Sequence, residues 1–505
     1  MEYDVIIGLE IHAELKTKSK MFCRCDNNPE GKEPNTNVCP ICLGHPGTLP
    51  YPNKQAIEWT VLLGCGLNAE INYYSKFDRK NYFYPDLPKG YQISQYDIPF
   101  VYNGHLEVNG EDVAITRIHL EEDTGKTRHP EGANYSLVDY NRAGTPLLEM
   151  VTEPVIQDAA TAKKFCQIYQ QVLRYLDISD ADMEKGQMRC EANVSIQEKD
   201  KWNYNQETGE IEPVEGYELN PKVELKNINS FRAIEKAIEY EIDRQKQARE
   251  SGEELVQETR GWDENKGKTI RQRVKETAAD YRYFPEPDIP PFNLDGQWVE
   301  EIKSGLVELP PDKKKRFQEQ YSFDEETAEI LTSDKQLASY SENVISELRA
   351  WLDSEGDDWE RQKTKLAKSA ANWLVSELFK HLKDNNETIS DIKITPENFA
   401  ELIFLVYKGK VNSSAGQKIL QTMYEQGGEP TSIMNDLGLE QIDDESELEQ
   451  TVQDILDKNP DQVEQYKQGK TNVLQYFVGQ TMAATKGKAN PQKVTEILQR
   501  LLNQE

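Results

Sequence analysis

The sequence contains no stretch of about 18 consecutive apolar residues, the length that a membrane-spanning helix needs. Its N-terminus, Met-Glu-Tyr-Asp-Val-Ile-Ile, has neither the basic segment nor the long apolar segment of a secretory signal peptide. We therefore expect a cytoplasmic protein with no membrane contact. Intrinsic disorder is excluded as a global description, because 37% of the 505 residues are hydrophobic and 24 are Tyr. This length predicts about three domains.

Basic residues are in the minority. The chain has 59 Lys and Arg against 89 Asp and Glu, a net charge of -30. A surface that is basic all over is therefore excluded, and any contact with nucleic acid must be local. Basic residues do gather near the C-terminus, where Glu496 is the single acidic residue between positions 467 and 500. Lys486 and Lys488 precede a helical apolar stripe there and are predicted to contact a phosphate backbone, a solubilising loop being the alternative.

Cysteine is scarce, since seven in so long a chain do not form a disulfide scaffold. Four of the seven nevertheless fall within twenty positions, as two close pairs. Two pairs of thiolates at this spacing predict a tetrahedral Zn²⁺ site whose role is structural. Four free cysteines, or a site that no longer binds metal, are the alternative. The four residues are Cys23, Cys25, Cys39 and Cys42.

Alternating apolar and polar runs fill residues 1 to about 290, for example at 7–15, 114–120 and 192–196. They predict strands of a mostly antiparallel sheet, with helices at 159–176 and 232–249. Four prolines at 285–291 predict the end of this domain. Helical periodicity dominates afterwards. The predicted class is α+β, with a large first domain at 1–291, an all-α domain at 292–405 and a small α-helical tail at 406–505.

A predicted strand over residues 7–15 carries a possible metal site. Its period of two puts Glu10, His12 and Glu14 on one face and apolar residues on the other. Further carboxylates follow at Glu121 and Glu122, where another predicted strand ends, and at Glu149 in an apolar segment. Oxygen ligands of this kind suit Mg²⁺, which links protein carboxylates to substrate phosphates. An ordinary solvated sheet face is the alternative.

The sequence lacks a P-loop, because Leu120 and Trp262 stand where that motif requires glycine. It also lacks a Ser-His-Asp arrangement, so covalent catalysis is not expected. Phosphate charge could instead be met by four basic residues in the aromatic-rich stretch 74–92, which are Lys76, Arg79, Lys80 and Lys89. Basic groups interleaved with aromatics also hold an unpaired RNA end. The alternative is a solvated loop with its aromatics in the core.

Taken together, these motifs resemble the family of the aspartyl/glutamyl-tRNA amidotransferase B subunits. The resemblance runs almost from end to end and rests on long matches in order, among them Gly-Leu-Glu-Ile-His at 8–12, the stretches 34–40 and 76–95, His-Leu-Glu-Glu-Asp at 119–123, and the stretches 139–149, 183–186, 189–195, 226–231, 257–260 and 280–285. Two departures are Ala279, where the family often has His, and Arg-Val-Lys at 273–275, where it usually has Arg-Ser-Lys.

The resemblance implies a cradle-shaped first domain, a helical domain and a tail similar to YqeY proteins. It also implies a carbon–nitrogen ligase that uses glutamine as amido donor. ATP phosphorylates the side-chain carboxyl of Glu-tRNA(Gln), and ammonia displaces the phosphate to give Gln-tRNA(Gln). Asp-tRNA(Asn) is allowed as a second substrate. The implied partners form a heterotrimer with this chain: an amidase, which is the A subunit and supplies the ammonia, and a small C subunit.

Site residues follow from the same resemblance. It implies Glu10, His12, Glu122 and Glu149 as catalytic residues and, with Glu121, as Mg²⁺ ligands or their neighbours; the cysteines carry over as a zinc motif. Two rivals remain. The related E subunit carries an inserted domain resembling part of aspartyl-tRNA synthetase, and the roughly one hundred helical residues between cradle and tail favour the B type. A non-catalytic tRNA-binding scaffold with a structural metal site is the rival from another class.

Overall fold

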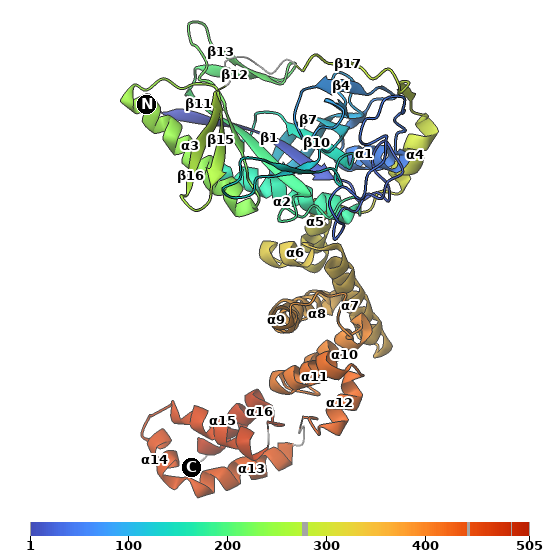
Figure 1. The fold of residues 1–505 in the computed structure, drawn as a ribbon. Helices are drawn as coiled ribbons and strands as arrows, with labels where there is room; N and C mark the ends of the chain where they lie inside the picture. The colour runs from blue at the N-terminus through green and yellow to red at the C-terminus, as the bar shows by residue number, and fades with distance from the viewer. Residues whose placement is uncertain (1, 275–280, 442–444, 486, 504–505) are drawn as a thin grey trace. The chain divides into compact units, whose positions relative to one another are not determined.

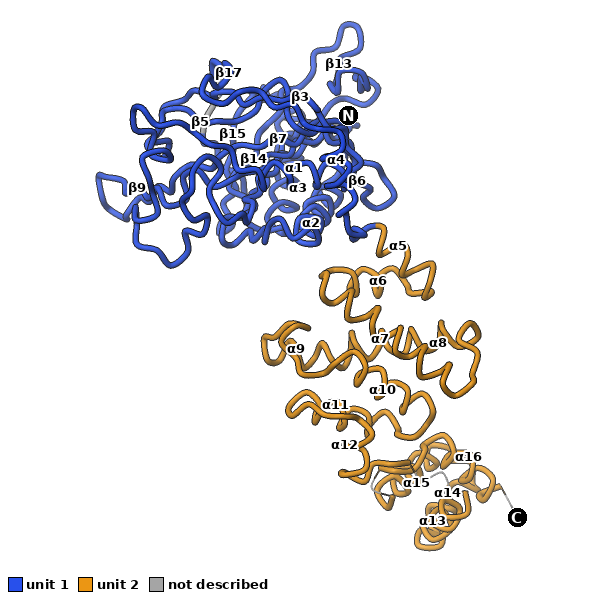
Figure 2. Tube along the Cα trace, turned by 90° about the vertical axis from the view of Figure 1, so that its right-hand side faces the viewer, with its two compact units in different colours: residues 1–311 blue, residues 312–505 orange. Residues whose placement is uncertain are grey.

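The computed structural model describes residues 2–274, 281–441, 445–485 and 487–503. Ala279 and Lys486 lie outside the described residues. The chain forms two compact units, Met1–Pro311 and Asp312–Glu505, which Figure 2 shows in different colours. Among the described residues, no helix combines the length and the apolar character that crossing a membrane requires.

A nine-stranded sheet forms the centre of the first unit, with the strand order β16-β15-β14-β11-β1-β10-β7-β6-β2 (Figure 1). Neighbouring strands run antiparallel except β14 and β15, which confirms the predicted mostly antiparallel sheet. The strands are β1 (Tyr3–Glu14), β2 (Glu70–Ile71), β6 (Val101–Val108), β7 (Glu111–Glu122), β10 (Pro146–Thr152), β11 (Met188–Glu198), β14 (Val223–Lys226), β15 (Glu258–Asp263) and β16 (Lys268–Val274).

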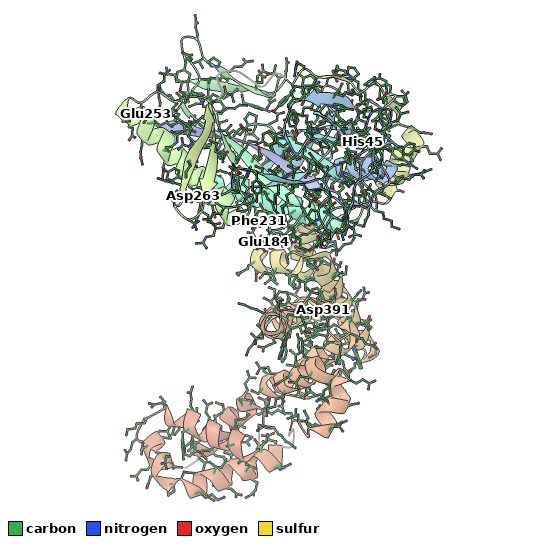
Figure 3. The ribbon with its side chains drawn as sticks, in the orientation of Figure 1. His45, Glu184, Phe231, Glu253, Asp263 and Asp391 are labelled. Carbon is green, nitrogen blue, oxygen red and sulfur yellow. The ribbon has the colours of Figure 1, made fainter. Side chains whose placement is uncertain are left out.

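Helices cover the apolar face of this sheet. Leu9 and Ile11 of β1 are almost fully buried, and so are Phe165 and Tyr169 of the helix α2. Side chains of Asp158 and Ser230 accept hydrogen bonds from the first turns of α2 and α3, which fixes where these helices begin. Figure 3 shows α3 running from Phe231 to the neighbourhood of Glu253. The helices of this unit are α1 (Lys54–Gly66), α2 (Ala159–Tyr175), α3 (Phe231–Ser251) and α4 (Gly296–Ser304).

Shorter strands form small sheets around the large one. Two of them, β17 and β18, lie at the two ends of the proline-rich segment and pair with β4 and β3. The first unit continues past this segment to Pro311, and the predicted domain boundary at residue 291 stays a prediction. The short strands are β3 (Tyr74–Ser75), β4 (Asp78–Asn81), β5 (Tyr91–Ser94), β8 (Lys126–Arg128), β9 (Leu137–Asp139), β12 (Trp202–Asn205), β13 (Glu210–Pro213), β17 (Phe284–Pro285) and β18 (Phe292–Asn293).

The described part of the second unit is helical, as predicted. It contains two hydrophobic cores, one formed by buried residues between Phe317 and Met434 and one between Leu448 and Leu502. A π-helical turn, η1 (Trp373–Leu378), continues directly from one helix into the next. The helices are α5 (Pro310–Tyr321), α6 (Glu325–Leu331), α7 (Lys335–Ser354), α8 (Trp359–Asn372), α9 (Phe379–Asn385), α10 (Pro396–Tyr407), α11 (Ser413–Gln426), α12 (Pro430–Asp436), α13 (Glu445–Lys458), α14 (Pro460–Lys467), α15 (Val473–Ala484) and α16 (Pro491–Leu502).

Candidate active site

A row of ionisable side chains crosses the polar face of the large sheet. His12 on β1 lies opposite Glu149 on β10, and Glu149 lies opposite His119 on β7. Directly opposite residues of antiparallel strands point to the same face. His12 Nε2 is 3.2 Å from Glu149 Oε2, and His119 Nε2 is 3.3 Å from the same oxygen. Glu10 and Glu121 flank the row, each with a carboxylate oxygen 3.9 Å from His12 Nε2.

The carboxylates of this row favour the protonated forms of its two histidines. Burial alone would raise the pKa of Glu149, but His119 and His12 hold it well below its usual value. Burial alone would lower the pKa of His119, but Glu149 and Glu121 raise it to about 9, and Glu149 likewise raises that of His12. The imidazoles thus take up protons to balance the carboxylates. A bound cation would replace those protons.

The donor atoms fit a divalent cation. One ligand atom from each of Glu10, His12 and Glu149 lies within 4.8 Å of the others, and the same holds for His119, Glu121 and Glu149. Carboxylate oxygens are the ligands that Mg²⁺ prefers, and imidazole extends the range to transition metals. His119 Nδ1 is buried and, within the described residues, has no hydrogen-bond partner. Glu149 belongs to both groups and is their common centre.

A third acidic group adjoins the row. Glu10, Glu191 and Glu224 also bring carboxylate oxygens within 4.8 Å of one another. The ammonium of Lys226 lies 2.5 Å from Glu191 and 3.4 Å from Glu224. The single positive charge of Lys226 thus offsets part of the negative charge of this group.

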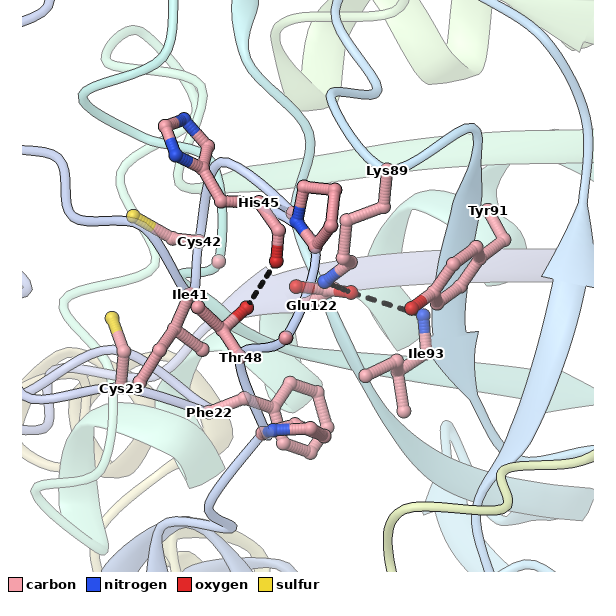
Figure 4. Close-up of a pocket in the computed structure, with 15 residues that line it drawn as sticks. Phe22, Cys23, Ile41, Cys42, His45, Thr48, Lys89, Tyr91, Ile93 and Glu122 are labelled. Atoms are coloured by element: carbon pink, nitrogen blue, oxygen red, sulfur yellow. Dashed lines mark hydrogen bonds and ion pairs between the residues drawn. The ribbon is translucent and has the colours of Figure 1, made fainter.

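Glu122 points elsewhere. Alternation along β7 directs it to the opposite face from Glu121, where it pairs with Lys89 and accepts a hydrogen bond of 3.0 Å from the Ile93 amide. Both side chains line a pocket of about 200 Å³ beside Cys42 and His45, drawn in Figure 4. The structure therefore does not bring Glu122 together with Glu10, His12 and Glu149.

Of the four basic residues singled out in the stretch 74–92, Lys80 faces the row. Burial alone would lower the pKa of Lys80, but the carboxylates of Glu121 and Glu149 raise it. Its ammonium lies 5.1 Å from the ring centroid of Tyr281. The other three have separate partners: Lys76 pairs with Asp78 and Asp97, Arg79 with Glu286 and Asp288, and Lys89 with Glu122.

The four cysteines of the predicted zinc motif do come together. One sulfur from each lies within 4.8 Å of the others. A hydrogen bond from Cys23 lowers the pKa of Cys42 to about 5, with help from the buried Lys20, whose Nζ is 3.9 Å from the Cys42 sulfur. Four thiols at this spacing fit a structural metal such as Zn²⁺. Figure 3 places His45, three residues after Cys42, on the opposite side of the first unit from Asp263.

The predicted basic patch of the tail is partly neutralised. Arg500 forms ion pairs of 3.0 Å with Glu445 and Glu449 of α13. Lys488 is half-buried, whereas Lys486 lies outside the described residues. The apolar stripe predicted for this region does form, with Val494 and Leu498 fully buried in α16.

His119 and Arg189 belong to this face but were absent from the candidate residues drawn from the sequence. His119 stands two residues before Glu121 on β7, and this spacing on a strand was a usable signal. Arg189 lies opposite His12 on β11, a relation that depends on how the strands pair.

Comparison with known proteins shows the family of the chain. Residues 5–300 match the family described as the GatB/GatE catalytic domain, and residues 358–502 match the GatB domain family that is named with YqeY. The chain is 44% identical over 506 residues to the B subunit of the aspartyl/glutamyl-tRNA(Asn/Gln) amidotransferase of Persephonella marina, covering 99% of this chain and 100% of the relative. It is also 44% identical to the protein of that name from Thermotoga neapolitana, with full coverage of both chains. The chain therefore belongs to the family of aspartyl/glutamyl-tRNA(Asn/Gln) amidotransferase B subunits.

Proposed function

We propose that this chain is the cytoplasmic subunit that activates and amidates the glutamate carried on a misacylated tRNA(Gln). ATP phosphorylates the side-chain carboxyl of that glutamate, and ammonia released from glutamine displaces the phosphate. Asp-tRNA(Asn) is a second substrate that the same site could accept. The observation that carries the proposal is the row of His12, Glu149 and His119, flanked by Glu10 and Glu121 on the polar face of the sheet.

The chemistry explains why such a row is needed. A carboxylate is a poor acyl donor, because its charge repels a nucleophile and oxide is a very poor leaving group. Phosphorylation removes both obstacles but concentrates negative charge. A Mg²⁺ ion held by Glu10, His12, Glu121 and Glu149 would supply positive charge where the phosphates lie. Lys80 adds a side-chain cation beside Glu121 and Glu149.

Other parts of the chain support the proposal by their chemistry. The sequence offers no amidase nucleophile, which fits an ammonia supply from a separate amidase chain in a heterotrimer that also contains a small third chain. The four-cysteine cluster would hold a structural Zn²⁺ and thereby fix a loop that lacks regular secondary structure. Lys486 and Lys488 remain the proposed contacts of the tail with the tRNA backbone.

The test uses the complex with its amidase partners, Glu-tRNA(Gln), ATP and ammonium chloride in place of glutamine. Ammonium removes the amidase reaction from the measurement. We expect Glu10→Gln to lower the rate of amidation at least about 100-fold, since it removes a ligand charge, while the Kd for tRNA changes less than about threefold. The control is Glu264→Gln, an exposed carboxylate in the turn between β15 and β16. Full activity in Glu10→Gln would refute the proposed metal site.

A further inference from the structure

The sheet carries an arginine that none of the preceding assignments uses. We propose that Arg189 contacts the phosphate that is transferred from ATP to the tRNA-borne carboxylate. This inference rests on the proposed function, because it names a contact for the phosphate in the same site. The observations behind it are the place of Arg189 in the sheet, the way its guanidinium is held, and the donors that this leaves unused.

Arg189 stands beside the row of proposed ligands. It lies on β11 directly opposite His12 of β1, so the two side chains project from the same face of the sheet. His12 in turn lies opposite Glu149. A phosphate bound to a cation in this row would therefore lie next to a residue whose planar, paired N–H groups match phosphate oxygens.

The guanidinium of Arg189 is held from one side. Its Nη2 donates a hydrogen bond of 3.0 Å to Asp123 Oδ2. Asp123 is itself buried and fixed, because its other carboxylate oxygen accepts from the Thr124 amide at 2.8 Å and its own amide donates to the Thr145 carbonyl at 2.7 Å. Arg142 lies 3.7 Å from the same carboxylate. Arg189 is thus oriented before any ligand binds, which lowers the cost of ordering it.

Most of the donors of Arg189 are unused. Arginine has five N–H donors, and among the described residues Asp123 is the single hydrogen-bond acceptor of this one. The side chain is 37% exposed, so the remaining donors can be reached from the polar face. A guanidinium with one anchored edge and one accessible edge is suited to hold a second anion.

The neighbouring cations are less suited to this role. Lys226 is occupied by Glu191 and Glu224. Arg117 is equally exposed at 37%, but its contact with Glu149, at 3.9 Å, is longer than a hydrogen bond. Lys80 is a point charge that adds attraction without the paired geometry of a guanidinium. Arg189 therefore combines proximity to His12, an anchored orientation and accessible donors.

The experiment measures ATP-dependent amidation of Glu-tRNA(Gln) by the complete complex, and in parallel the binding of Mn²⁺ alone by calorimetry. We expect Arg189→Gln to lower kcat/KM for ATP about 100-fold, as for the loss of paired charge-assisted hydrogen bonds, and to leave the Kd for Mn²⁺ within about threefold. Arg189→Lys keeps the charge but not the paired N–H groups, and its kcat/KM for ATP should fall about tenfold. The control is Arg361→Gln on α8, whose side chain is 83% exposed.

Two results would overturn the inference. One is an Arg189→Gln complex that matches Arg361→Gln in kcat and in KM for ATP, or a greater loss in Arg117→Gln than in Arg189→Gln. The other is a parallel loss of Mn²⁺ and ATP binding, which would make Arg189 a support for the metal ligands. If Arg189→Gln does not fold, Arg189→Lys is compared with Arg361→Gln in its place. Failure of the proposed function is distinguishable, since it would appear as a wild-type complex that needs no ATP or as full activity in Glu10→Gln.

Discussion

Glu149→Gln is the sharpest perturbation of the proposed metal site. Glu149 is shared by the two three-residue groups of the row, and its Oε2 lies 3.2 Å from His12 Nε2 and 3.3 Å from His119 Nε2. The substitution keeps the shape of the side chain and removes one negative charge at the centre. We therefore expect a single change to weaken cation binding by both groups.

The expected magnitude follows from Coulomb's law. Two unit charges about 4 Å apart interact by about 4 kcal/mol at an effective dielectric constant of about 20. The interaction energy with a divalent cation is twice as large. In Glu149→Gln the amide oxygen still contacts the cation and a water molecule can enter, and together they recover most of the lost energy. A net loss of about 3 kcal/mol corresponds to a Kd for the cation that is roughly 100-fold weaker.

Calorimetric titration with Mn²⁺ at neutral pH measures this Kd directly, since Mn²⁺ takes the same oxygen ligands as Mg²⁺. The control is Glu264→Gln, which removes one carboxylate from an exposed turn of the same unit. We expect the control to bind as the wild type does. A Kd for Glu149→Gln within about threefold of the wild type would refute the placement of the cation between the two histidines.

Three further predictions concern stability. Cys39→Ser should abolish zinc retention, measured by plasma mass spectrometry, and lower the Tm of the first unit by several degrees, whereas a site without metal would give equal zinc contents. The pKa of Glu14 is raised to about 8 by burial and by Asp123, so the folded state favours its neutral form and wild-type stability is lost as pH rises from about 4.5 to 8. The free energy of unfolding of Glu14→Gln should therefore rise relative to that of the wild type over this pH range, by up to about 1.4 kcal/mol per pH unit. Urea unfolding in the presence of chelator measures this difference, and a difference that does not change with pH would contradict the prediction. Phe77→Ala should cost about 3–5 kcal/mol, because this buried ring packs edge-on against Phe22, Phe100 and Phe292, and an unchanged Tm would contradict it.

Part of the site could be predicted from the sequence, because side chains alternate between the two faces of a strand. Glu10 and His12 stand two positions apart in a strand whose other residues, Leu9 and Ile11, are buried, so their common face could be predicted without knowing the partners of the strand. The same rule separates Glu121 from Glu122. Adjacent residues of a strand point to opposite faces, and the structure accordingly directs Glu122 to Lys89.

The pairing of strands that are distant in the sequence could not be predicted from this alternation. His12, Glu149 and His119 form a row because β1, β10 and β7 pair in one register, and a shift by one residue would separate them. The basic residues Arg79 and Lys89 appeared free in the sequence, but Glu286 and Glu122 pair with them in the fold. Residue type identified possible phosphate contacts, and only the fold shows which of them already have partners.

Charge balance on the polar face also constrains the order of binding. Glu10, Glu121, Glu149, Glu191 and Glu224 all lie in the three acidic groups, and the side-chain cations closest to them are largely neutralised by these same carboxylates. Because His12, His119, Lys80 and Lys226 already balance most of these carboxylates, the phosphates of ATP would find little net attraction there unless a cation enters before them or with them. We therefore expect ATP to bind measurably in the presence of Mg²⁺ or Mn²⁺ and at least about tenfold more weakly with chelator, which calorimetry can test. Equal affinity in both conditions would mean that the nucleotide phosphates do not lie over the row, and the site of phosphoryl transfer would then have to be sought away from His12 and Glu149.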